Sequence, residues 1–247
     1  MPSGKVSVVG NGPGELEHLT SRAREAIEES DLVIGYKLYV DQVAGLIEGK
    51  EVVASAMGKE VERCRRAVSE ARAGKKVALI SGGDPGIYGM AGLLLQVAGE
   101  ADPDLEVEII PGVTAAGAAA AVLGAPLMHD FAVISLSDLL TPWELIEKRL
   151  RAAAEADFVI VLYNPRSRGR SDLLVRAREI VLTHRQGRTP VGIVRAAGRE
   201  AQNQWKTSLE ELTGCLEEID MASLVIIGNS CTYWDNHRMI TPRGYPL

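Results

Sequence analysis

The segment 81–89 combines residue types that suit ligand binding. It packs four glycines, one proline and one acidic residue, Asp84, into nine positions. Glycine has no Cβ, so the backbone at Gly82 and Gly83 can approach a ligand closely. The Asp84 carboxylate can accept hydrogen bonds from hydroxyl or amino groups, or it could form an Asx-turn or cap the helix expected after it. On residue types alone, both interpretations of Asp84 stay open.

A second glycine-rich segment, 10–15, has the sequence GNGPGE. It differs from the dinucleotide-binding fingerprint, which requires a third glycine where this chain has Glu15. Pro13 has no N–H to offer a pyrophosphate, and no Gly-Lys-Ser/Thr follows, as a Walker loop would need. We therefore expect neither type of nucleotide site. Pro13 between two glycines favours a rigid wall beside a flat ligand.

Glycine- and proline-rich segments follow other predicted strands as well. In open α/β sheets, ligands bind outside the carboxyl ends of the strands. Tight turns would explain any single segment, but six of them together predict a shared ligand cleft. The six segments are 10–14, 81–86, 111–114, 163–169, 196–198 and 228–230.

The elements that must position these segments alternate between strands and helices. Short β-branched runs predict buried strands, and apolar residues at helical spacing predict helices between them. We expect an α/β fold of two α/β domains with mostly parallel sheets, residues 1–123 and 124–247. We expect Gly74 to follow a helix as its C-cap and Thr141 to cap the start of another. The expected strands are 5–9, 32–34, 76–80, 106–110, 131–135, 158–162, 191–194 and 224–227, and the expected helices are 22–29, 61–73, 89–98, 115–123, 142–154, 172–184 and 209–216.

Composition excludes several classes of protein. The net charge of −6 argues against a general nucleic-acid binder, which usually carries a basic surface. Three widely spaced cysteines argue against a disulfide framework, and neither cysteines nor histidines show metal-ligand spacing. The sequence has neither a signal-peptide pattern nor an apolar run long enough to cross a bilayer. We expect a cytoplasmic protein with no metal, nucleic-acid or membrane partner.

Three of the loop segments resemble the tetrapyrrole (corrin/porphyrin) methylase family. They read GNGPG at 10–14, GGDP at 82–85 and PGVTA at 111–115. Within that family, further stretches resemble the group that methylates C17 of precorrin-3B or of its cobalt form, cobalt-factor III. These stretches are GAPLMHDF at 124–131, ISLSDLLTPW at 134–143, LYNPRS at 162–167, GNS at 228–230 and TPRGY at 241–245.

The resemblance implies a two-domain tetrapyrrole methylase fold with the active-site cleft between the domains. It also implies a homodimer that uses S-adenosyl-L-methionine as methyl donor and releases S-adenosyl-L-homocysteine. Pro13 should face the tetrapyrrole substrate. The cofactor-binding residues implied by position are Gly82, Gly83, Asp84, Ile87, Tyr88, Thr114, Ala115, Tyr163, Ala196, Ala222 and Ser223.

The implied chemistry needs few reactive side chains. The sulfonium of the methyl donor is already a good leaving group, so the enzyme mainly aligns the reacting atoms. The C17-methylating group also contracts the macrocycle, which needs proton movement. Asp138 and Ser137, with Ser135 beside them, could assist that step or could simply form a turn and cap a helix.

Arginines could hold the acetate and propionate groups of such a substrate, because a guanidinium binds carboxylates bidentately. Arg166, Arg168 and Arg170 cluster on one loop, and Arg195 and Arg199 follow the next strand. A solvated surface loop would explain the same charges.

Two other functions stay open for this sequence. One is a different tetrapyrrole methylase, acting on precorrin-4 C11 or uroporphyrinogen III. The other is a non-catalytic module that binds a tetrapyrrole or nucleotide.

Overall fold

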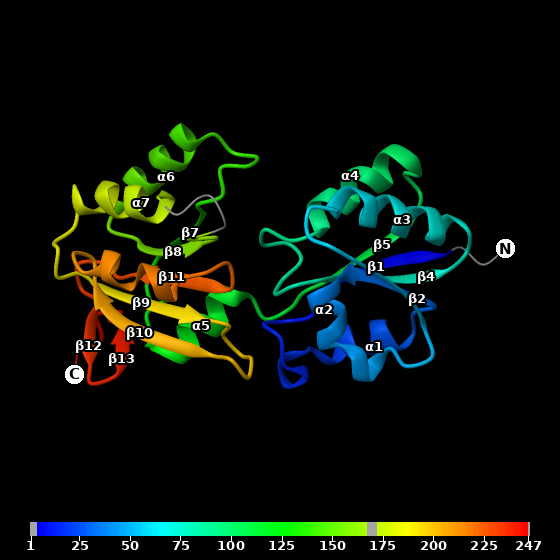
Figure 1. Cartoon of the computed structure of the whole chain (residues 1–247), viewed down its shortest axis with the longest axis horizontal. Coiled ribbons are helices and arrows are strands. Elements are labelled where there is room, and N and C mark those ends of the chain that lie inside the picture. Colours follow the sequence, from blue (N-terminus) through cyan, green and yellow to red (C-terminus); the bar gives the residue numbers. More distant parts are fainter. Residues whose placement is uncertain (1–3, 167–171, 247) are drawn as a thin grey trace. The chain divides into compact units, whose positions relative to one another are not determined.

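The computed structural model describes residues 4–166 and 172–246 (Figure 1). The chain divides into two compact units, Met1–Ala115 and Ala116–Leu247. This division precedes the boundary expected near Gly124. It assigns nearly all of the helix α5 (Ala115–Leu123) to the second unit, where the Leu123 side chain lies against Gly192: a Cβ on Gly192 would come within 2.4 Å of it.

The sheet of the first unit is parallel throughout. Its strand order is β3-β2-β4-β1-β5, and each of its pairings is parallel, as the buried β-branched runs predict. All five strands therefore end at the same edge of the sheet. The strands are β1 (Lys5–Gly10), β2 (Leu32–Tyr36), β3 (Glu51–Ser55), β4 (Lys76–Ser81) and β5 (Glu106–Ile110).

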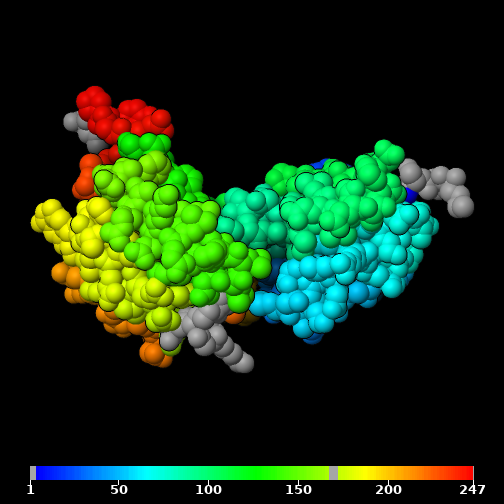
Figure 2. All heavy atoms as spheres, turned by 90° about the horizontal axis from the view of Figure 1, so that it is seen from above, coloured from blue at the N-terminus to red at the C-terminus, as the bar shows by residue number. Residues whose placement is uncertain are grey.

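Helices cover both faces of this sheet (Figure 1). The helices α1 (Ser21–Glu28) and α2 (Lys37–Gln42) bury Ile27 and Val40 against one face. The helices α3 (Glu60–Arg72) and α4 (Ala91–Ala101) bury Val68 and Leu94 against the other, and they cover that face side by side as cyan and green atoms in Figure 2. Chain segments leaving β2 and β4 therefore turn to opposite faces. Two short 3-10 helices, η1 (Leu16–His18) and η2 (Ala44–Leu46), complete the unit.

The sheet of the second unit is mixed, unlike the mostly parallel sheet expected. In the order β10-β9-β11-β8-β7 only β7 and β8 pair in parallel. The segment 196–202 between β9 and β10 is too short for a crossover helix, so β10 returns antiparallel to β9. The strands are β7 (Phe131–Ser135), β8 (Val159–Tyr163), β9 (Pro190–Arg195), β10 (Asn203–Ser208) and β11 (Ser223–Ile227).

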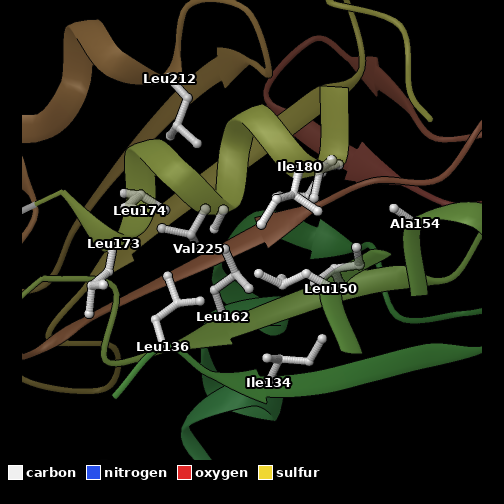
Figure 3. Close-up of a cluster of buried hydrophobic side chains, with 14 of the residues drawn as sticks. Ile134, Leu136, Leu150, Ala154, Leu162, Leu173, Leu174, Ile180, Leu212 and Val225 are labelled. Carbon is white, nitrogen blue, oxygen red and sulfur yellow. The ribbon is translucent and has the colours of Figure 1, made fainter. Parts of the chain in front are cut away.

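One face of this sheet is covered by α6 (Trp143–Glu155), α7 (Leu173–Leu182) and the 3-10 helix η3 (Leu212–Glu218). Figure 3 shows Leu150 and Ile180 from these helices pointing towards Leu162 and Val225 of the strands. A small sheet in the order β12-β13-β6 completes the unit, from Tyr233–Asp235, Arg238–Ile240 and Gly124–Ala125. None of the helices in the described ranges is long and apolar enough to span a membrane.

Two local expectations have different outcomes. Gly74 follows α3 with φ +98° and donates its N–H to the Ala71 carbonyl, so the predicted helix end is confirmed. The predicted cap at Thr141 is wrong. The helix α6 begins at Trp143, its N-cap is Pro142, and that residue makes no side-chain capping bond.

Candidate active site

Backbone groups join the loops that follow β1, β4 and β5. Gly12 and Gly83 exchange N–H···O bonds of 3.2 and 2.8 Å, forming an isolated bridge between two loops. A Cβ on Gly112 would lie 2.2 Å from the Gly83 carbonyl oxygen, and one on Gly10 would lie 2.7 Å from the Gly112 nitrogen. Gly10 and Gly112 are therefore required for the loops to pack against one another.

Asp84 organises the same loops. Its Oδ1 accepts a hydrogen bond from the Gly86 N–H at 2.8 Å, which is the Asx-turn geometry, and Oδ2 accepts one from Gly112 N–H at 3.2 Å. It does not cap a helix, since α4 starts only at Ala91. The carboxylate keeps lone pairs for further donors, so the structural role leaves room for a ligand contact.

Tyr88, on the same loop, has an unusual backbone. Its φ of +53° lies in the left-handed region, and its side chain is 57% exposed. A residue with a Cβ pays a conformational penalty there, and such strain concentrates at ligand-binding sites. The loop folds back over the end of β4, since Met90 N–H donates to Ser81 Oγ at 3.3 Å. The neighbouring candidate Ile87 is also exposed, at 38%.

A pocket of about 170 Å³ opens beside this loop at the carboxyl ends of β2, β3 and β4. The sequence analysis did not identify most of its lining. Gly82 is part of the lining, and it must be glycine because a Cβ there would come 2.4 Å from the Tyr39 ring. The lining residues are Tyr36, Tyr39, Met57, Glu60, Arg63, Ile80, Ser81, Gly82, Tyr88, Gly89 and Met90.

In the second unit, three candidate cofactor residues come together at one sheet edge. Ala196 follows β9 with φ +51°, and its N–H donates to the Ala222 carbonyl at 3.0 Å. Ser223, at the start of β11, donates its hydroxyl to Asp220 at 3.1 Å. Because β11 is antiparallel to β8 and β9, its start lies at the edge where those strands end.

Tyr163, the last residue of β8, lies at the same edge. Its hydroxyl accepts a hydrogen bond from the backbone N–H of Ala116 at 3.0 Å, in the first turn of α5. Tyr163 therefore bonds the residue that directly follows the candidates Thr114 and Ala115 in the sequence. The hydrogen bond explains why a tyrosine suits this position, and the half-buried ring keeps part of its surface accessible.

The candidates for proton transfer lie on the loop after β7. Ser135 Oγ accepts hydrogen bonds from Asn164 Nδ2 at 2.9 Å and from Ser137 N–H at 3.2 Å, so it holds the turn together. Asn164 has φ +52°, a second left-handed residue with a side chain at this edge. Ser137 is half-buried and Asp138 is exposed. The turn thus presents both residues beside the end of β8.

The arginine candidates are only partly described. Arg166 donates to the Leu216 carbonyl and lies 3.4 Å from a carboxylate oxygen of Glu217, so it ties the loop after β8 to η3. Arg168 and Arg170 lie outside the described residues. Arg195 stacks over the Trp205 ring at 5.5 Å.

The shared cleft predicted from six loops is wrong for the segment 228–230. It follows β11, which is antiparallel, so it lies at the opposite sheet edge beside Asp157. Ser230 Oγ donates to Asp157 Oδ2 at 2.6 Å, and Arg185 Nη1 lies 2.9 Å from Oδ1. Burial lowers the pKa of the Arg185 guanidinium, while Asp157 opposes that shift. This network supports the fold at the edge remote from the candidate residues.

Within the described ranges, no three His, Cys, Asp or Glu side chains are grouped closely enough to hold a metal ion. The candidate residues therefore form two groups. The first unit holds the Asp84 loop and the tyrosine-lined pocket beside it. The second unit holds Tyr163, Ala196, Ala222 and Ser223, with the Ser135 turn beside them. Both groups combine backbone N–H and carbonyl groups with strained residues, as a binding site for a polar organic ligand would.

Comparisons with known proteins identify the family of this chain. Residues 5–213 match the family described as Tetrapyrrole (Corrin/Porphyrin) Methylases. A Salmonella typhimurium protein named probable cobalt-factor III C(17)-methyltransferase is 52% identical over 98% of this chain and 100% of its own length. A cobalt-factor III methyltransferase of Priestia megaterium is 50% identical over 98% of this chain, which spans only 45% of that longer protein.

Two solved structures are similar over nearly the whole chain. The methyltransferase CobJ superposes with a TM-score of 0.91 at 37% identity, covering 97% of this chain and 100% of that one. A uroporphyrin-III C-methyltransferase from Thermus thermophilus superposes with a TM-score of 0.72 at 27% identity, covering 91% and 97%. The latter structure is a complex with S-adenosyl homocysteine.

Proposed function

This chain belongs to the tetrapyrrole (corrin/porphyrin) methylases, and from that premise we propose that it methylates C17 of a corrin precursor with S-adenosylmethionine as donor. The observation that carries the proposal is the 52% identity over the full length of a relative named for that reaction. Because two relatives at 52% and 50% identity are named for cobalt-factor III, we propose cobalt-factor III as the first substrate to test, ahead of precorrin-3B.

The residues present fit an S-adenosyl ligand. Tyr88 and Ala196 keep side chains in left-handed backbone, and such strained residues cluster at ligand-binding sites. We propose that the cofactor contacts Gly82, Gly83, Asp84, Ile87 and Tyr88, together with Thr114, Ala115, Tyr163, Ala196, Ala222 and Ser223. The cofactor, when bound, supplies an activated methyl group. The protein supplies binding and orientation, which can account for about 7–11 kcal/mol of a barrier.

Proton movement during ring contraction is assigned to the Ser135 turn. We propose that Asp138 exchanges the proton and that Ser137 positions it. The turn is rigid, because Ser135 Oγ accepts two hydrogen bonds and Leu136 N–H donates to the Tyr163 carbonyl at 2.9 Å. A fixed turn holds a general acid or base better than a mobile one. We also propose that Pro13 borders the tetrapyrrole and that Arg166, Arg168 and Arg170 bind its carboxylates.

The deciding experiment is incubation of the purified protein with S-adenosylmethionine and, separately, cobalt-factor III, precorrin-3B, precorrin-4 and uroporphyrinogen III. Mass spectra should show one added methyl group on cobalt-factor III or precorrin-3B, with an absorption change that reports ring contraction. Methylation of precorrin-4 or uroporphyrinogen III alone would assign the chain to another reaction of the family. Binding without any methyl transfer would favour a non-catalytic module. Light scattering on the same sample tests the expected homodimer.

A further inference from the structure

We propose that the pocket at the carboxyl ends of β2, β3 and β4 binds one carboxylate side chain of the tetrapyrrole, with Arg63 as its cationic partner. The inference rests on the proposed function, which supplies a substrate bearing acetate and propionate groups. It adds a specificity-determining residue that the sequence analysis did not identify. All of the groups involved belong to the first unit.

The pocket lies where neighbouring parallel strands connect to helices on opposite faces of the sheet. The segment after β2 turns into α2 on one face, whereas the segments after β3 and β4 lead to α3 and α4 on the other. Neighbouring strands whose connections go to opposite faces leave a crevice outside their carboxyl ends, and open α/β sheets bind ligands there. Between β1 and β4 the crevice is filled by the Gly12–Gly83 bridge. Between β2 and its neighbours it remains open as the pocket.

The guanidinium of Arg63 is the unusual feature of this crevice. Its side chain is only 5% exposed, yet it lines the pocket. It donates from Nη1 to Ser55 Oγ and the Ala56 carbonyl, both at 2.9 Å, and from Nη2 to Glu60 at 2.9 Å. A guanidinium has five N–H groups. Two of them, on Nε and Nη2, therefore have no partner among the described residues.

A carboxylate would satisfy these remaining donors. N–H groups on a charged side chain favour a charged acceptor, and a carboxylate can accept two of them. Glu60 also lines the pocket and pairs with Arg63, but its side chain is 42% exposed and that of Arg63 only 5%, so water screens the carboxylate more than the guanidinium. The Arg63 charge is thus held in place by partners that leave part of it facing the pocket.

The other walls suit the aliphatic stem of such a side chain. Tyr36 and Tyr39 pack edge to face with ring centroids 5.3 Å apart, and they form one wall. Met57 and Tyr88 lie at the rim, 53% and 57% exposed, where a bound group would cover them. The volume of about 170 Å³ is far below the several hundred Å³ typical of a pocket for a whole drug-sized ligand. It therefore fits a substituent and leaves the macrocycle outside.

The first test fills the pocket without removing a buried bond. Met57→Trp places a larger side chain at an exposed rim position, and Val61→Trp is the matched control, 44% exposed on α3 outside the pocket lining. Tetrapyrrole titrations in the presence of S-adenosylhomocysteine should show a dissociation constant roughly 10- to 100-fold weaker for Met57→Trp, as for loss of one charge-assisted contact. Val61→Trp should bind as wild type does. Gly82 and Tyr88 line this pocket and are also proposed cofactor contacts, so S-adenosylhomocysteine affinity is measured in both variants. A loss of S-adenosylhomocysteine affinity as large as the loss of tetrapyrrole affinity would assign the pocket to the cofactor and overturn the inference.

The second test identifies the chemistry. Arg63→Gln should weaken tetrapyrrole binding, and Arg63→Lys should partly restore it. With a tetrapyrrole whose carboxylates are methyl esters, wild type and Arg63→Gln should bind equally. If wild type methylates the substrate and both Met57→Trp and Arg63→Gln bind the free acid normally, the pocket is not a substrate subsite. If wild type binds no tetrapyrrole, the proposed function fails and this inference with it.

Discussion

Ala196 donates its backbone N–H to the carbonyl of Ala222 at 3.0 Å while its own φ is +51°. The bond joins the end of β9 to the start of β11, and it fixes two candidate cofactor residues next to each other. The left-handed conformation is unfavourable for alanine by about 1–2 kcal/mol, and glycine adopts it freely.

Ala196→Gly should therefore raise the free energy of unfolding by roughly 0.5–1 kcal/mol, because relief of strain exceeds the extra entropy of the unfolded chain. Ala196→Val should lower it, because β-branched residues tolerate this conformation worst. Calorimetric unfolding measures both effects. Titration with S-adenosylhomocysteine shows whether the variants still bind this ligand through the backbone at position 196. A destabilised glycine variant would mean that the alanine methyl group packs usefully and that the strain is small.

Asp84 is expected to affect both stability and binding. Removing its carboxylate leaves the N–H groups of Gly86 and Gly112 without their acceptor, so Asp84→Ala should lose about 1–3 kcal/mol of stability. Asp84→Asn keeps one carbonyl acceptor and should lose less. If Asp84 also contacts the cofactor, both variants should bind S-adenosylhomocysteine more weakly. An alanine variant with normal stability and normal affinity would contradict both roles.

Some elements of this fold follow from local sequence pattern and others do not. The alanine-rich helix Ala115–Leu123 and the strand Phe131–Ser135 have the predicted bounds, because local pattern and tertiary packing agree there. The strand Asn203–Ser208 was missed. It is a polar edge strand, NQWKTS, whose pairing with β9 depends on a distant segment and not on its own hydrophobicity.

The candidate site was predictable to a similar extent. Loops after parallel strands could be identified from glycine and proline, since those residues are local signals. Strand direction is not a local signal, and for that reason the segment 228–230 was assigned to the wrong edge. Arg63 was overlooked because its position on α3 reads as an ordinary charged helix residue. Only the folded structure brings its buried side chain to Ser55 and Ala56, at the end of β3 and beside the pocket.

Arg166 offers a test of the proposed substrate contacts. Its guanidinium is shared with the Leu216 carbonyl and Glu217, and we expect Arg166→Ala to weaken tetrapyrrole binding more than S-adenosylhomocysteine binding. Arg166→Lys should rescue only part of the loss, because lysine cannot bind bidentately. Paired titrations on both variants provide the measurement. A lower melting temperature with unchanged tetrapyrrole affinity would show that Arg166 only stabilises the packing of η3 and does not bind the substrate.

Acid sensitivity is expected at the Arg22–Glu108 pair, which joins α1 to β5 through bonds of 2.7 and 2.6 Å. The hydrogen bond from Arg22 lowers the pKa of Glu108. A carboxylate with a lowered folded-state pKa stabilises the protein above its unfolded pKa, and that contribution is lost as the pH falls through the folded value. Glu108→Gln should therefore melt below wild type at pH 7, and the gap should narrow below about pH 4. An equal gap at both pH values would show that the pair contributes through packing alone.

Arg185 should be among the most sensitive positions remote from the candidate site. Its side chain is 4% exposed and donates to the carbonyls of Ala154, Phe158 and Gly228, with Asp157 as its charge partner. Methionine fills similar space but leaves those carbonyls and one carboxylate without a donor. Arg185→Met should therefore lose about 3 kcal/mol of stability.

Arg188→Met is the control, since that exposed arginine bonds only the side chain of Gln186 among described residues, and it should unfold like wild type. Urea unfolding of both variants measures the difference. Because the network lies at the sheet edge opposite Ala196 and Tyr163, any Arg185→Met protein that remains folded should bind S-adenosylhomocysteine normally, and weakened binding in that folded fraction would show that the two edges are coupled.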